Sequence, residues 1–243
     1  MVRNAFKRLV ANAARTRPGK ALVHAAVLES PADLRFSRVR SWPAEIRGFE
    51  DLAFLFSSNQ LNHGIASLQI DEAALLYRVA RDAGSATLAE IGRFKGGSTI
   101  ITAAALHPKA ELWSYDLHVA LRPDMPGKLL DSELANALSR FELDSRVHLI
   151  VADSRLVEPP SEPLASLFID GDHSYKGARA DYVRWREFVA PGGNLLFHDA
   201  VDAGGYTNHC PGIARLVTEI ERDDPDFARL PGAGSIAHFV KRG

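Results

Sequence analysis

The stretch Leu-Phe-Ile-Asp-Gly-Asp-His-Ser-Tyr, residues 167 to 175, decides how the rest of the sequence is interpreted. A short apolar run that stops at acidic residues is typical of a buried parallel strand whose carboxyl end opens into a binding site. A second strand end of this kind follows at Phe-His-Asp-Ala, residues 197 to 200. We therefore expect the polar side chains of both ends to converge on one site, where carboxylates and imidazoles can serve metal binding or acid-base chemistry. They are Asp170, Asp172, His173, His198 and Asp199.

Length and composition limit the possible functions. The 243 residues are 46% hydrophobic, which suffices for one large α/β domain with an N-terminal extension. A formal net charge of -1 gives no electrostatic reason to expect a nucleic acid as partner. The single cysteine, Cys210, excludes an internal disulfide, and a reducing cytoplasm is the expected location. No stretch has the roughly 18 to 20 unbroken apolar residues of a membrane span, and the apolar region of a secretory signal is missing.

The N-terminal region differs from the rest in its charge. Residues 1–20 carry basic side chains and no acidic one, and their apolar residues recur at helical spacing, which predicts a basic amphipathic helix. Such a helix can dock on the domain or on a second subunit, or lie on a membrane surface, and we expect it to be docked. We also expect the protein to form a homodimer or a higher homo-oligomer. We expect residues 1–63 to form an N-terminal extension or lid and residues 64–243 to form the main domain.

A glycine-rich turn follows the first predicted strand of that domain. The sequence Thr-Leu-Ala-Glu-Ile-Gly-Arg-Phe-Lys-Gly-Gly-Ser-Thr, residues 87–99, indicates a strand, a turn and the start of a helix. Glycines let the backbone approach a ligand closely, and the free amides of a helix start favour polar or anionic groups. The spacing matches neither Gly-x-Gly-x-x-Gly nor a P-loop. Glu90, two residues before Gly92, would repel a pyrophosphate and suits a positively charged cofactor.

The remaining pattern alternates strands and helices. The second strand, residues 111–115, ends at Asp116, a position from which acidic residues commonly bind ribose hydroxyls. Pro191-Gly192-Gly193 introduces the fifth strand. The other predicted elements are helices at residues 71–80, 99–106, 127–141, 178–189 and 213–222, strands at 147–151, 165–169 and 194–197, and a closing antiparallel hairpin at 227–230 and 235–241.

These motifs together resemble class I S-adenosylmethionine-dependent methyltransferases. The resemblance rests on Glu-Ile-Gly-x-x-x-Gly-Gly-Ser-Thr at 90–99, the acidic end of the second strand, Ile-Asp-Gly-Asp-His-Ser-Tyr at 169–175, and the Pro-Gly-Gly and His-Asp that flank the fifth strand. It covers roughly residue 64 onward. Within the class, the sequence is most similar to small-molecule O-methyltransferases related to macrolide-sugar and cephalosporin-pathway enzymes.

The resemblance implies a fold and a set of site residues. The fold is a Rossmann-like α/β domain with a seven-stranded sheet in the order 3-2-1-4-5-7-6, strand 7 being antiparallel, and helices on both faces. For the cofactor, Glu90, Gly92 and Ser98 are expected at the methionine and ribose end. Asp116 is expected at the ribose hydroxyls, and Asp153 with Ser154 beside the adenine. Asp170 is expected both beside the cofactor and as a metal ligand.

The resemblance also implies a divalent metal, magnesium or manganese, held at the positions of Asp170, His198 and Asp199, with His173 as general base. Related enzymes have an acidic residue at the place of His198, so the ion is either absent here or one that accepts imidazole. His198 could equally be a half-buried histidine without a metal. Asp172, Tyr206 and His209 are expected to be exposed loop residues, and Cys210 has no base in its own motif that would make it a nucleophile.

The function that these residues predict is metal-assisted O-methylation of a small polar acceptor, such as a sugar or a glycosylated natural product. Two other classes of function stay open. One is a non-catalytic adenosylmethionine or nucleotide-binding regulator, which would need no base. The other is an NAD-dependent oxidoreductase, against which Glu90 and the glycine spacing both speak.

Overall fold

The computed structural model describes residues 42–56, 64–118, 127–201 and 210–243. Its centre is a seven-stranded sheet in the order β3-β2-β1-β4-β5-β7-β6. Strands β1 to β5 pair in parallel, while β7 runs antiparallel to both β5 and β6. The predicted strand order and orientation are confirmed. The strands are β1 (Thr87–Ile91), β2 (Leu112–Asp116), β3 (Val147–Val151), β4 (Leu164–Ile169), β5 (Val189–Phe197), β6 (Phe227–Ala233) and β7 (Ile236–Lys241).

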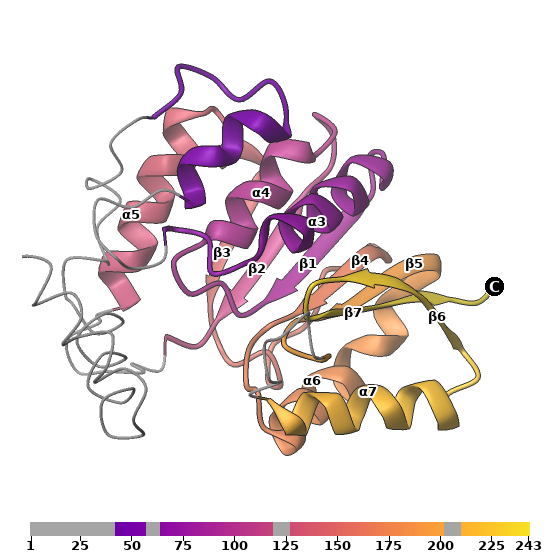
Figure 1. The fold of residues 1–243 in the computed structure, drawn as a ribbon. Coiled ribbons are helices and arrows are strands. Elements are labelled where there is room, and N and C mark those ends of the chain that lie inside the picture. The colour runs from indigo at the N-terminus through magenta and orange to yellow at the C-terminus, as the bar shows by residue number, and fades with distance from the viewer. Residues whose placement is uncertain (1–41, 57–63, 119–126, 202–209) are drawn as a thin grey trace, which may run out of the picture.

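Helices cover both faces of the sheet (Figure 1). On one face lie α3, α4 and α5, with α3 packed on α4; on the other face α6 packs on α7. The bounds are η3 (Phe49–Phe56), α3 (Ile70–Asp82), α4 (Gly97–Ala105), α5 (Gly127–Arg140), η4 (Asp144–Arg146), α6 (Tyr175–Trp185), η5 (Arg186–Phe188) and α7 (Pro211–Asp223). Each predicted helix of the described residues is therefore present to within a few residues of its predicted bounds.

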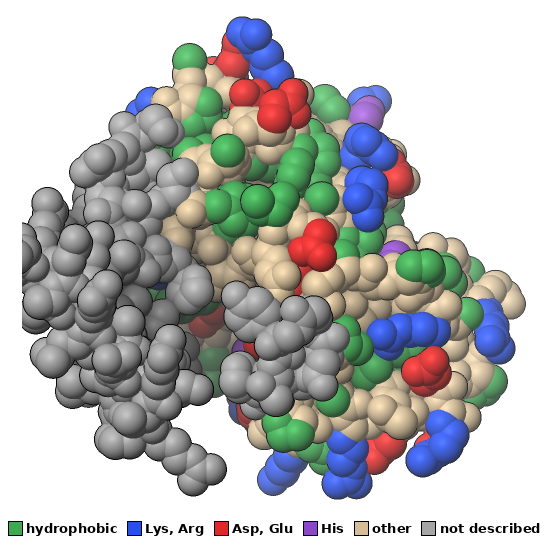
Figure 2. All heavy atoms as spheres, viewed as in Figure 1, with side chains coloured by type: hydrophobic (Ala, Val, Ile, Leu, Met, Phe, Trp, Pro, Cys, Tyr) green, Lys and Arg blue, Asp and Glu red, His purple; other side chains and the backbone are tan. Residues whose placement is uncertain are grey.

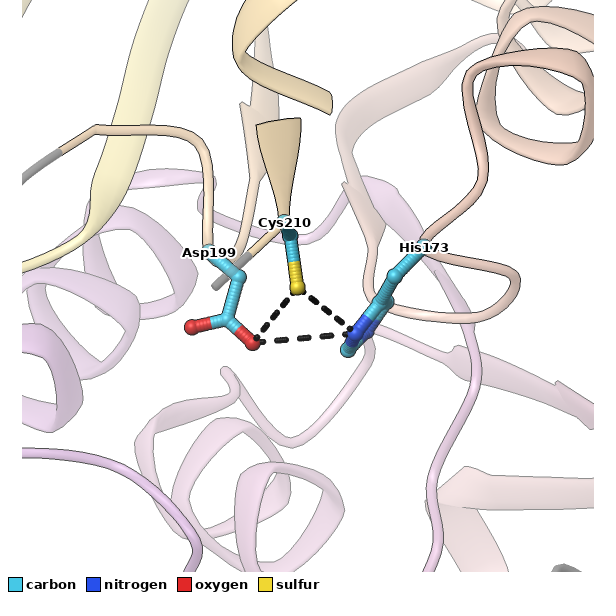
Figure 3. Close-up of side chains that lie close together, drawn as sticks. All are labelled: His173, Asp199 and Cys210. Atoms are coloured by element: carbon cyan, nitrogen blue, oxygen red, sulfur yellow. Dashed lines mark hydrogen bonds and ion pairs between the residues drawn. The ribbon is translucent and has the colours of Figure 1, made fainter. Parts of the chain in front are cut away.

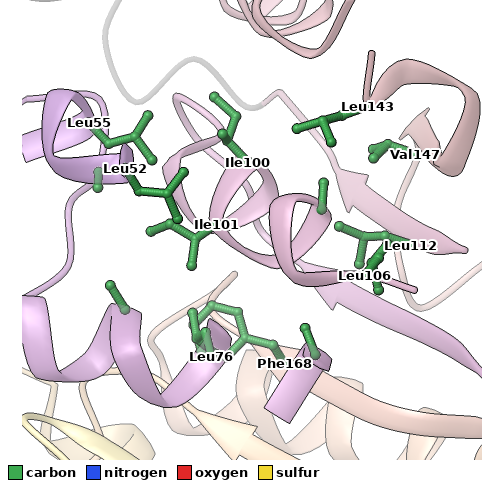
Figure 4. Packing of buried hydrophobic residues seen from close by; sticks show 14 of the residues in the cluster. Leu52, Leu55, Leu76, Ile100, Ile101, Leu106, Leu112, Leu143, Val147 and Phe168 are labelled. Atoms are coloured by element: carbon green, nitrogen blue, oxygen red, sulfur yellow. The ribbon is translucent and has the colours of Figure 1, made fainter. Parts of the chain in front are cut away.

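Two hydrophobic cores hold these layers together. The first lies on the α3–α4–α5 face and is filled by aliphatic side chains such as Leu76, Ile100 and Ile101 (Figure 4). The second lies on the α6–α7 face around Trp185 and Phe197, which are fully buried. The carboxyl-terminal halves of β4 and β5, residues 167–169 and 195–197, are covered on both sides, which explains why these two stretches are apolar throughout.

Two strand boundaries differ from the sequence prediction. Strand β5 begins at Val189 rather than Asn194, because Val189 pairs with Leu164 before the register shifts between Leu164 and Ser166. Strand β6 continues through Pro231 to Ala233, with another register shift before Ala233. Bulges of this kind let a strand absorb glycine and proline that a regular ladder would exclude.

The predicted basic helix at residues 1–20 lies outside the described residues. The boundary between an extension and the domain at residue 63 stays a prediction. Within the described part of that extension, η3 buries Leu52 and Leu55 in the first core. None of the helices in the described ranges is long and apolar enough to cross a membrane. On the face shown in Figure 2, Lys and Arg side chains are interspersed with Asp and Glu rather than gathered into one basic area.

Candidate active site

The carboxyl ends of β1, β4 and β5 lie side by side in the sheet. The Asp170 N–H donates to the carbonyl of Ile91 at 2.8 Å, and the His198 N–H donates to the carbonyl of Ile169 at 3.1 Å. At Gly92 the backbone has a φ of 86°, and a Cβ there would lie 2.3 Å from the carbonyl oxygen of Asp170. Only glycine permits this contact. The glycine-rich turn and the loop that carries Asp170 are therefore in direct backbone contact.

Glu90 is buried at the end of β1 and surrounded by hydroxyl groups. Its carboxylate accepts hydrogen bonds from Ser98, from Thr99 at 2.6 Å and from Ser114 at 2.6 Å. Burial raises the pKa of Glu90, and the three hydroxyl hydrogen bonds oppose that rise. The predicted pair Glu90 and Ser98 is thus brought together, with Ser98 at the start of α4 oriented by the carboxylate.

Asp116 organises the turn that follows β1. Its carboxylate accepts the backbone N–H groups of Arg93 at 2.9 Å, Phe94 at 3.1 Å and His118 at 2.7 Å. Burial alone would raise the pKa of Asp116, but these N–H donors lower it. The predicted ribose-binding residue therefore also fixes the backbone of the glycine-rich turn.

Sequence reasoning missed Arg93, whose fully buried side chain ties that turn to α5. Its guanidinium donates to both carboxylate oxygens of Asp131, at 2.9 and 3.1 Å, and to the carbonyls of Ser114 and Ile150. Such a two-pronged pair is the arrangement that a planar guanidinium favours. In the sequence, this role of Arg93 is indicated by a single arginine between the glycines of a buried motif.

Asp153 and Ser154, the residues predicted beside the adenine, follow β3 and have separate partners. Asp153 accepts hydrogen bonds from the backbone and side chain of Arg155, which lower its pKa. The Ser154 hydroxyl donates to Asp181 of α6 at 2.6 Å. Burial raises the pKa of Asp181. Because the end of β3 pairs with Asp116 at the end of β2, Asp153 and Ser154 lie on the same edge of the sheet as Asp116.

The second group of polar residues surrounds Asp170, and we call it the histidine cluster. Oδ1 of Asp170 lies 3.1 Å from Nε2 of His173 and 3.0 Å from Nδ1 of His198. Nε2 of His198 in turn lies 3.4 Å from Glu72 of α3. Both ring nitrogens of His198 therefore face carboxylates. The members of the histidine cluster are Glu72, Asp170, His173, His198, Asp199 and Cys210.

Glu72 was not predicted as a site residue and is buried beneath the cluster. It accepts the backbone N–H of Gln69 at 2.7 Å and both the N–H and hydroxyl of Ser235, at 2.6 and 2.8 Å. Ser235 precedes β7, so this carboxylate links α3 to the closing hairpin. In the sequence, Glu72 follows Gln69 by three positions, which reads as an ordinary helix-start pattern.

The other side of the cluster is formed by His173, Asp199 and Cys210, whose side chains point toward one another (Figure 3). Nδ1 of His173 lies 3.3 Å from Sγ of Cys210 and 3.7 Å from Oδ2 of Asp199. Sγ of Cys210 lies 3.7 Å from the same Asp199 oxygen. Asp199 also lies 3.9 Å from Nδ1 of His198. The structure thus brings His173, His198, Asp170 and Asp199 together as predicted, and it adds Cys210.

Asp172 lies apart from this group. Its carboxylate accepts the backbone N–H of Ser174 at 2.9 Å, in the loop before α6. Asp172 is exposed, in agreement with the expectation of a solvated loop residue, so it does not join the convergence expected of the five polar side chains. Tyr206 and His209 lie outside the described residues.

The cluster shifts the pKa of each of its buried members. Burial works against the charged form of His198, but Asp170 and Glu72 raise its pKa to about 11. Burial also opposes ionisation of Glu72 and Asp170, yet the histidines lower both pKa values to about 2. The hydrogen bond to Asp170 raises the pKa of His173, and burial with Asp199 raises that of Cys210 to about 11. The two carboxylates therefore favour the protonated form of His198.

The chain matches a known family over its central part. Residues 89–200 match the family model described as a methyltransferase domain. This stretch runs from β1 to the end of β5 and contains every predicted site residue. The predicted resemblance to class I S-adenosylmethionine-dependent methyltransferases is therefore confirmed.

Solved structures show the same fold in O-methyltransferases. The O-methyltransferase TomG from Streptomyces achromogenes, in complex with SAM, is 19% identical with a TM-score of 0.55, and the match covers 74% of this chain and 83% of that one. An O-methyltransferase from Bacillus cereus with SAH is 18% identical, with a TM-score of 0.55 over 72% and 83%. A putative O-methyltransferase from Klebsiella pneumoniae is 16% identical, with a TM-score of 0.55 over 92% and 96%. The narrower similarity to sugar and cephalosporin-pathway enzymes stays a prediction.

Proposed function

We propose that this protein is an S-adenosylmethionine-dependent O-methyltransferase that methylates a hydroxyl of a small polar acceptor, such as a sugar or a glycosylated natural product. The observation that carries the proposal is the backbone contact between Gly92 and Asp170. It sets the glycine-rich turn, where the family binds its cofactor, directly beside a cluster that can remove a proton. The SAM and SAH complexes of the similar structures support the choice of cofactor.

The cofactor side supplies binding and orientation. We propose that Glu90, Gly92 and Ser98 lie against the methionine and ribose end, that Asp116 binds the ribose hydroxyls, and that Asp153 with Ser154 lies beside the adenine. Asp116 already has three amide donors on its carboxylate, so the turn around the cofactor is preformed. Preformed sites lose less entropy when the ligand binds.

Methyl transfer itself needs alignment and one proton acceptor. The acceptor oxygen attacks the methyl carbon, the carbon–sulfur bond breaks, and its electron pair leaves with sulfur as a neutral thioether. The hydroxyl proton must go to a base. We propose His173 for this role, because Asp170 orients its Nε2 at 3.1 Å and its Nδ1 faces the open side of the cluster beside Asp199 and Cys210.

Divalent-cation assistance is the second part of the proposal. Asp170 and Asp199 are like charges that reach one cluster, where His198 lies 3.0 Å from the first and 3.9 Å from the second and offsets part of their repulsion. A divalent ion nearby would offset the rest. His198 does not fit the predicted ligand set, because Asp170 and Glu72 already occupy both of its ring nitrogens. We therefore propose that a cation is held without His198. When bound, such an ion makes the acceptor hydroxyl easier to deprotonate.

Two assays test the function. Thermal-shift measurements with adenosylmethionine, adenosylhomocysteine and NAD should show stabilisation by the first two only, of about 2.7 kcal/mol at a ligand concentration 100 times the Kd. An acceptor panel of sugars, glycosides and phenols, scored by adenosylhomocysteine release, should then give turnover with a glycosylated acceptor. Stabilisation by adenosylmethionine with no turnover on any acceptor would favour the regulatory alternative. Stabilisation by NAD alone would favour the oxidoreductase.

The role of a cation needs a separate assay. Methyl transfer should fall after treatment with EDTA and return on adding a divalent metal. Undiminished turnover in chelator, with no metal found by elemental analysis, would leave His173 as the base without assistance from an ion.

A further inference from the structure

We propose that His173, Asp199 and Cys210 together form a binding site for a divalent ion of the zinc class. Their donor atoms are Nδ1 of His173, Oδ2 of Asp199 and Sγ of Cys210, and all three lie within 4.8 Å of one another. The three residues come from different parts of the chain: the loop after β4, the end of β5 and the residue before α7 (Figure 3). The inference rests on the proposed function, and it names the ion and the ligands that would assist the reaction.

The distances between the three donors are compatible with a shared ion, although the two contacts of the Cys210 thiol are also within hydrogen-bond range for sulfur. The distances are 3.3 Å between His173 and Cys210, and 3.7 Å for each of the two contacts with Asp199. Nitrogen, oxygen and sulfur ligands at about 2.0 to 2.3 Å from a tetrahedral zinc lie roughly 3.3 to 3.6 Å apart. The His173–Asp199 separation is too long for an N–H···O hydrogen bond. One ion placed between the three atoms would satisfy each of them.

The surroundings of His173 are those of a metal-bound histidine. A ligating imidazole usually donates its other N–H to a carboxylate, which fixes the ring and strengthens the ligand. Here the nitrogen that faces away from the three donors, Nε2, lies 3.1 Å from Asp170. Asp170 is itself held by His198, and His198 by Glu72. Asp170 would therefore act as a positioning residue for the ligand His173 rather than as a ligand.

The types of donor select the class of ion. Magnesium takes oxygen ligands in octahedral geometry, whereas zinc and similar ions accept imidazole and thiolate in tetrahedral geometry. One carboxylate, one imidazole and one thiol therefore favour the zinc class over the magnesium or manganese expected from the sequence. Three protein ligands leave a fourth position open, as in catalytic zinc sites. With side chains 38% and 37% exposed, His173 and Asp199 are accessible from solvent.

The proposal assigns His173 two roles that exclude each other. The lone pair on Nδ1 of His173 can either take the proton from the hydroxyl of the methyl-accepting substrate or bind the ion, but it cannot do both at once. In the metal-free protein His173 is the base. With the ion bound, His173 would be a ligand. The ion would then lower the pKa of the acceptor hydroxyl, and the hydroxyl proton would pass to solvent, to which the site is open.

Cobalt(II) is the probe that tests the site, because tetrahedral cobalt–thiolate centres absorb light through a charge-transfer transition. Cys210 is the single cysteine of the sequence, so a thiolate band can come from no other residue. Titration of the chelator-treated full chain with Co²⁺ should give this band at one ion per chain, and Zn²⁺ should displace it. Cys210→Ser should abolish the band. Asp170→Asn should keep the band but weaken affinity by about 10- to 100-fold, the usual effect of losing a partner of a metal ligand.

A histidine far from the cluster supplies the matched control. His148 lies on β3 and pairs with Glu111, so His148→Gln should keep both the band and the affinity. Absence of the band in the wild type, or equal affinity for Zn²⁺ in the wild type and Cys210→Ser, would overturn the proposal. Metal binding without the band would instead indicate an oxygen-ligand site on the carboxylates.

Cofactor binding, measured on the same samples, separates the two proposals and checks the fold of each variant. Wild type and Cys210→Ser should bind adenosylmethionine alike. If both bind the cofactor but no cobalt–thiolate band forms, the metal site is wrong and the methyltransferase proposal stands. If neither binds adenosylmethionine, the proposed function itself is wrong.

Discussion

The two ends of the candidate site hold their carboxylates in different ways. On the proposed cofactor side, Glu90 is surrounded by hydroxyls and Asp116 by backbone N–H groups. In the histidine cluster, Asp170 and Glu72 are paired with imidazoles. Hydroxyls and amides do not change charge with pH, whereas imidazoles do.

The difference indicates a division of labour. On the proposed cofactor side, the donors around Glu90 and Asp116 carry no titratable charge. The histidine cluster holds groups that can exchange a proton or bind an ion. Substitutions on the cofactor side should therefore change stability and cofactor affinity, and those in the cluster should change turnover and pH dependence.

The largest expected effect comes from the cluster. His173→Ala should lower turnover by about 10² to 10⁴, because the acceptor's proton then has no base, while adenosylmethionine affinity stays at the wild-type value. Steady-state kinetics and calorimetry measure the two quantities. His107→Ala, in an exposed turn after α4, is the control and should retain turnover. A similar loss of cofactor affinity in His173→Ala would show that His173 also contributes to cofactor binding, which would contradict the proposed separation between the two sides.

On the cofactor side, the largest effect should be on stability. The side chain of Arg93 is 0% exposed and Asp131 is 22% exposed. Arg93→Met therefore leaves the Asp131 carboxylate with His118 as its remaining partner and removes the donor to the carbonyls of Ser114 and Ile150. We expect a loss of about 3 to 5 kcal/mol in the free energy of unfolding, measured by urea denaturation. Arg155→Met removes the corresponding exposed arginine–aspartate pair and should cost less than about 1 kcal/mol. Equal effects would show that the burial of Arg93 contributes nothing.

A third prediction concerns the acid stability of the cluster. The pKa of Glu72 is about 2 in the folded protein and 4.5 as the ordinary value, so its contribution is present above pH 4.5 and is lost as the pH falls toward 2. That contribution is roughly 3 kcal/mol in the wild type. Glu72→Gln should therefore be less stable at neutral pH and lose less stability on acidification, as followed by urea midpoints. Glu158→Gln, at a side chain 89% exposed, should follow the wild type.

The smallest of these effects should be on cofactor affinity. Asp116→Ala removes the proposed ribose contact and the acceptor of three backbone N–H groups. Losing a hydrogen bond to a charged group costs roughly 1.5 to 3 kcal/mol, so the Kd for adenosylmethionine should rise about tenfold or more. Calorimetry showing an unchanged Kd would remove Asp116 from the cofactor site.

The sequence allowed the sheet and half of the site to be predicted because both depend on local pattern. Apolar runs that stop at Asp116, Asp170 and Asp199 mark strand ends, and the order of strands follows from the family resemblance. Glu72 could not be found in this way, since its partners His198 and Ser235 lie 126 and 163 positions away. The place of Cys210 in the cluster could not be found either, because its own motif holds no base, whereas its neighbour His173, the proposed base, comes from another loop.

The bond between Glu72 and Ser235 also has a consequence for the order in which the molecule forms during synthesis. Glu72 is translated 163 positions before the serine that holds it. Strands β1 to β4 and the helices between them can pack as soon as they are made, because domains fold from the N-terminal side while synthesis continues. Until Ser235 has been added and the hairpin has closed, Glu72 lacks the two hydrogen bonds from Ser235 that hold it beside His198. A nascent chain should therefore acquire its cofactor cradle before its proton-handling cluster, so the ability to bind adenosylmethionine should precede the ability to use it.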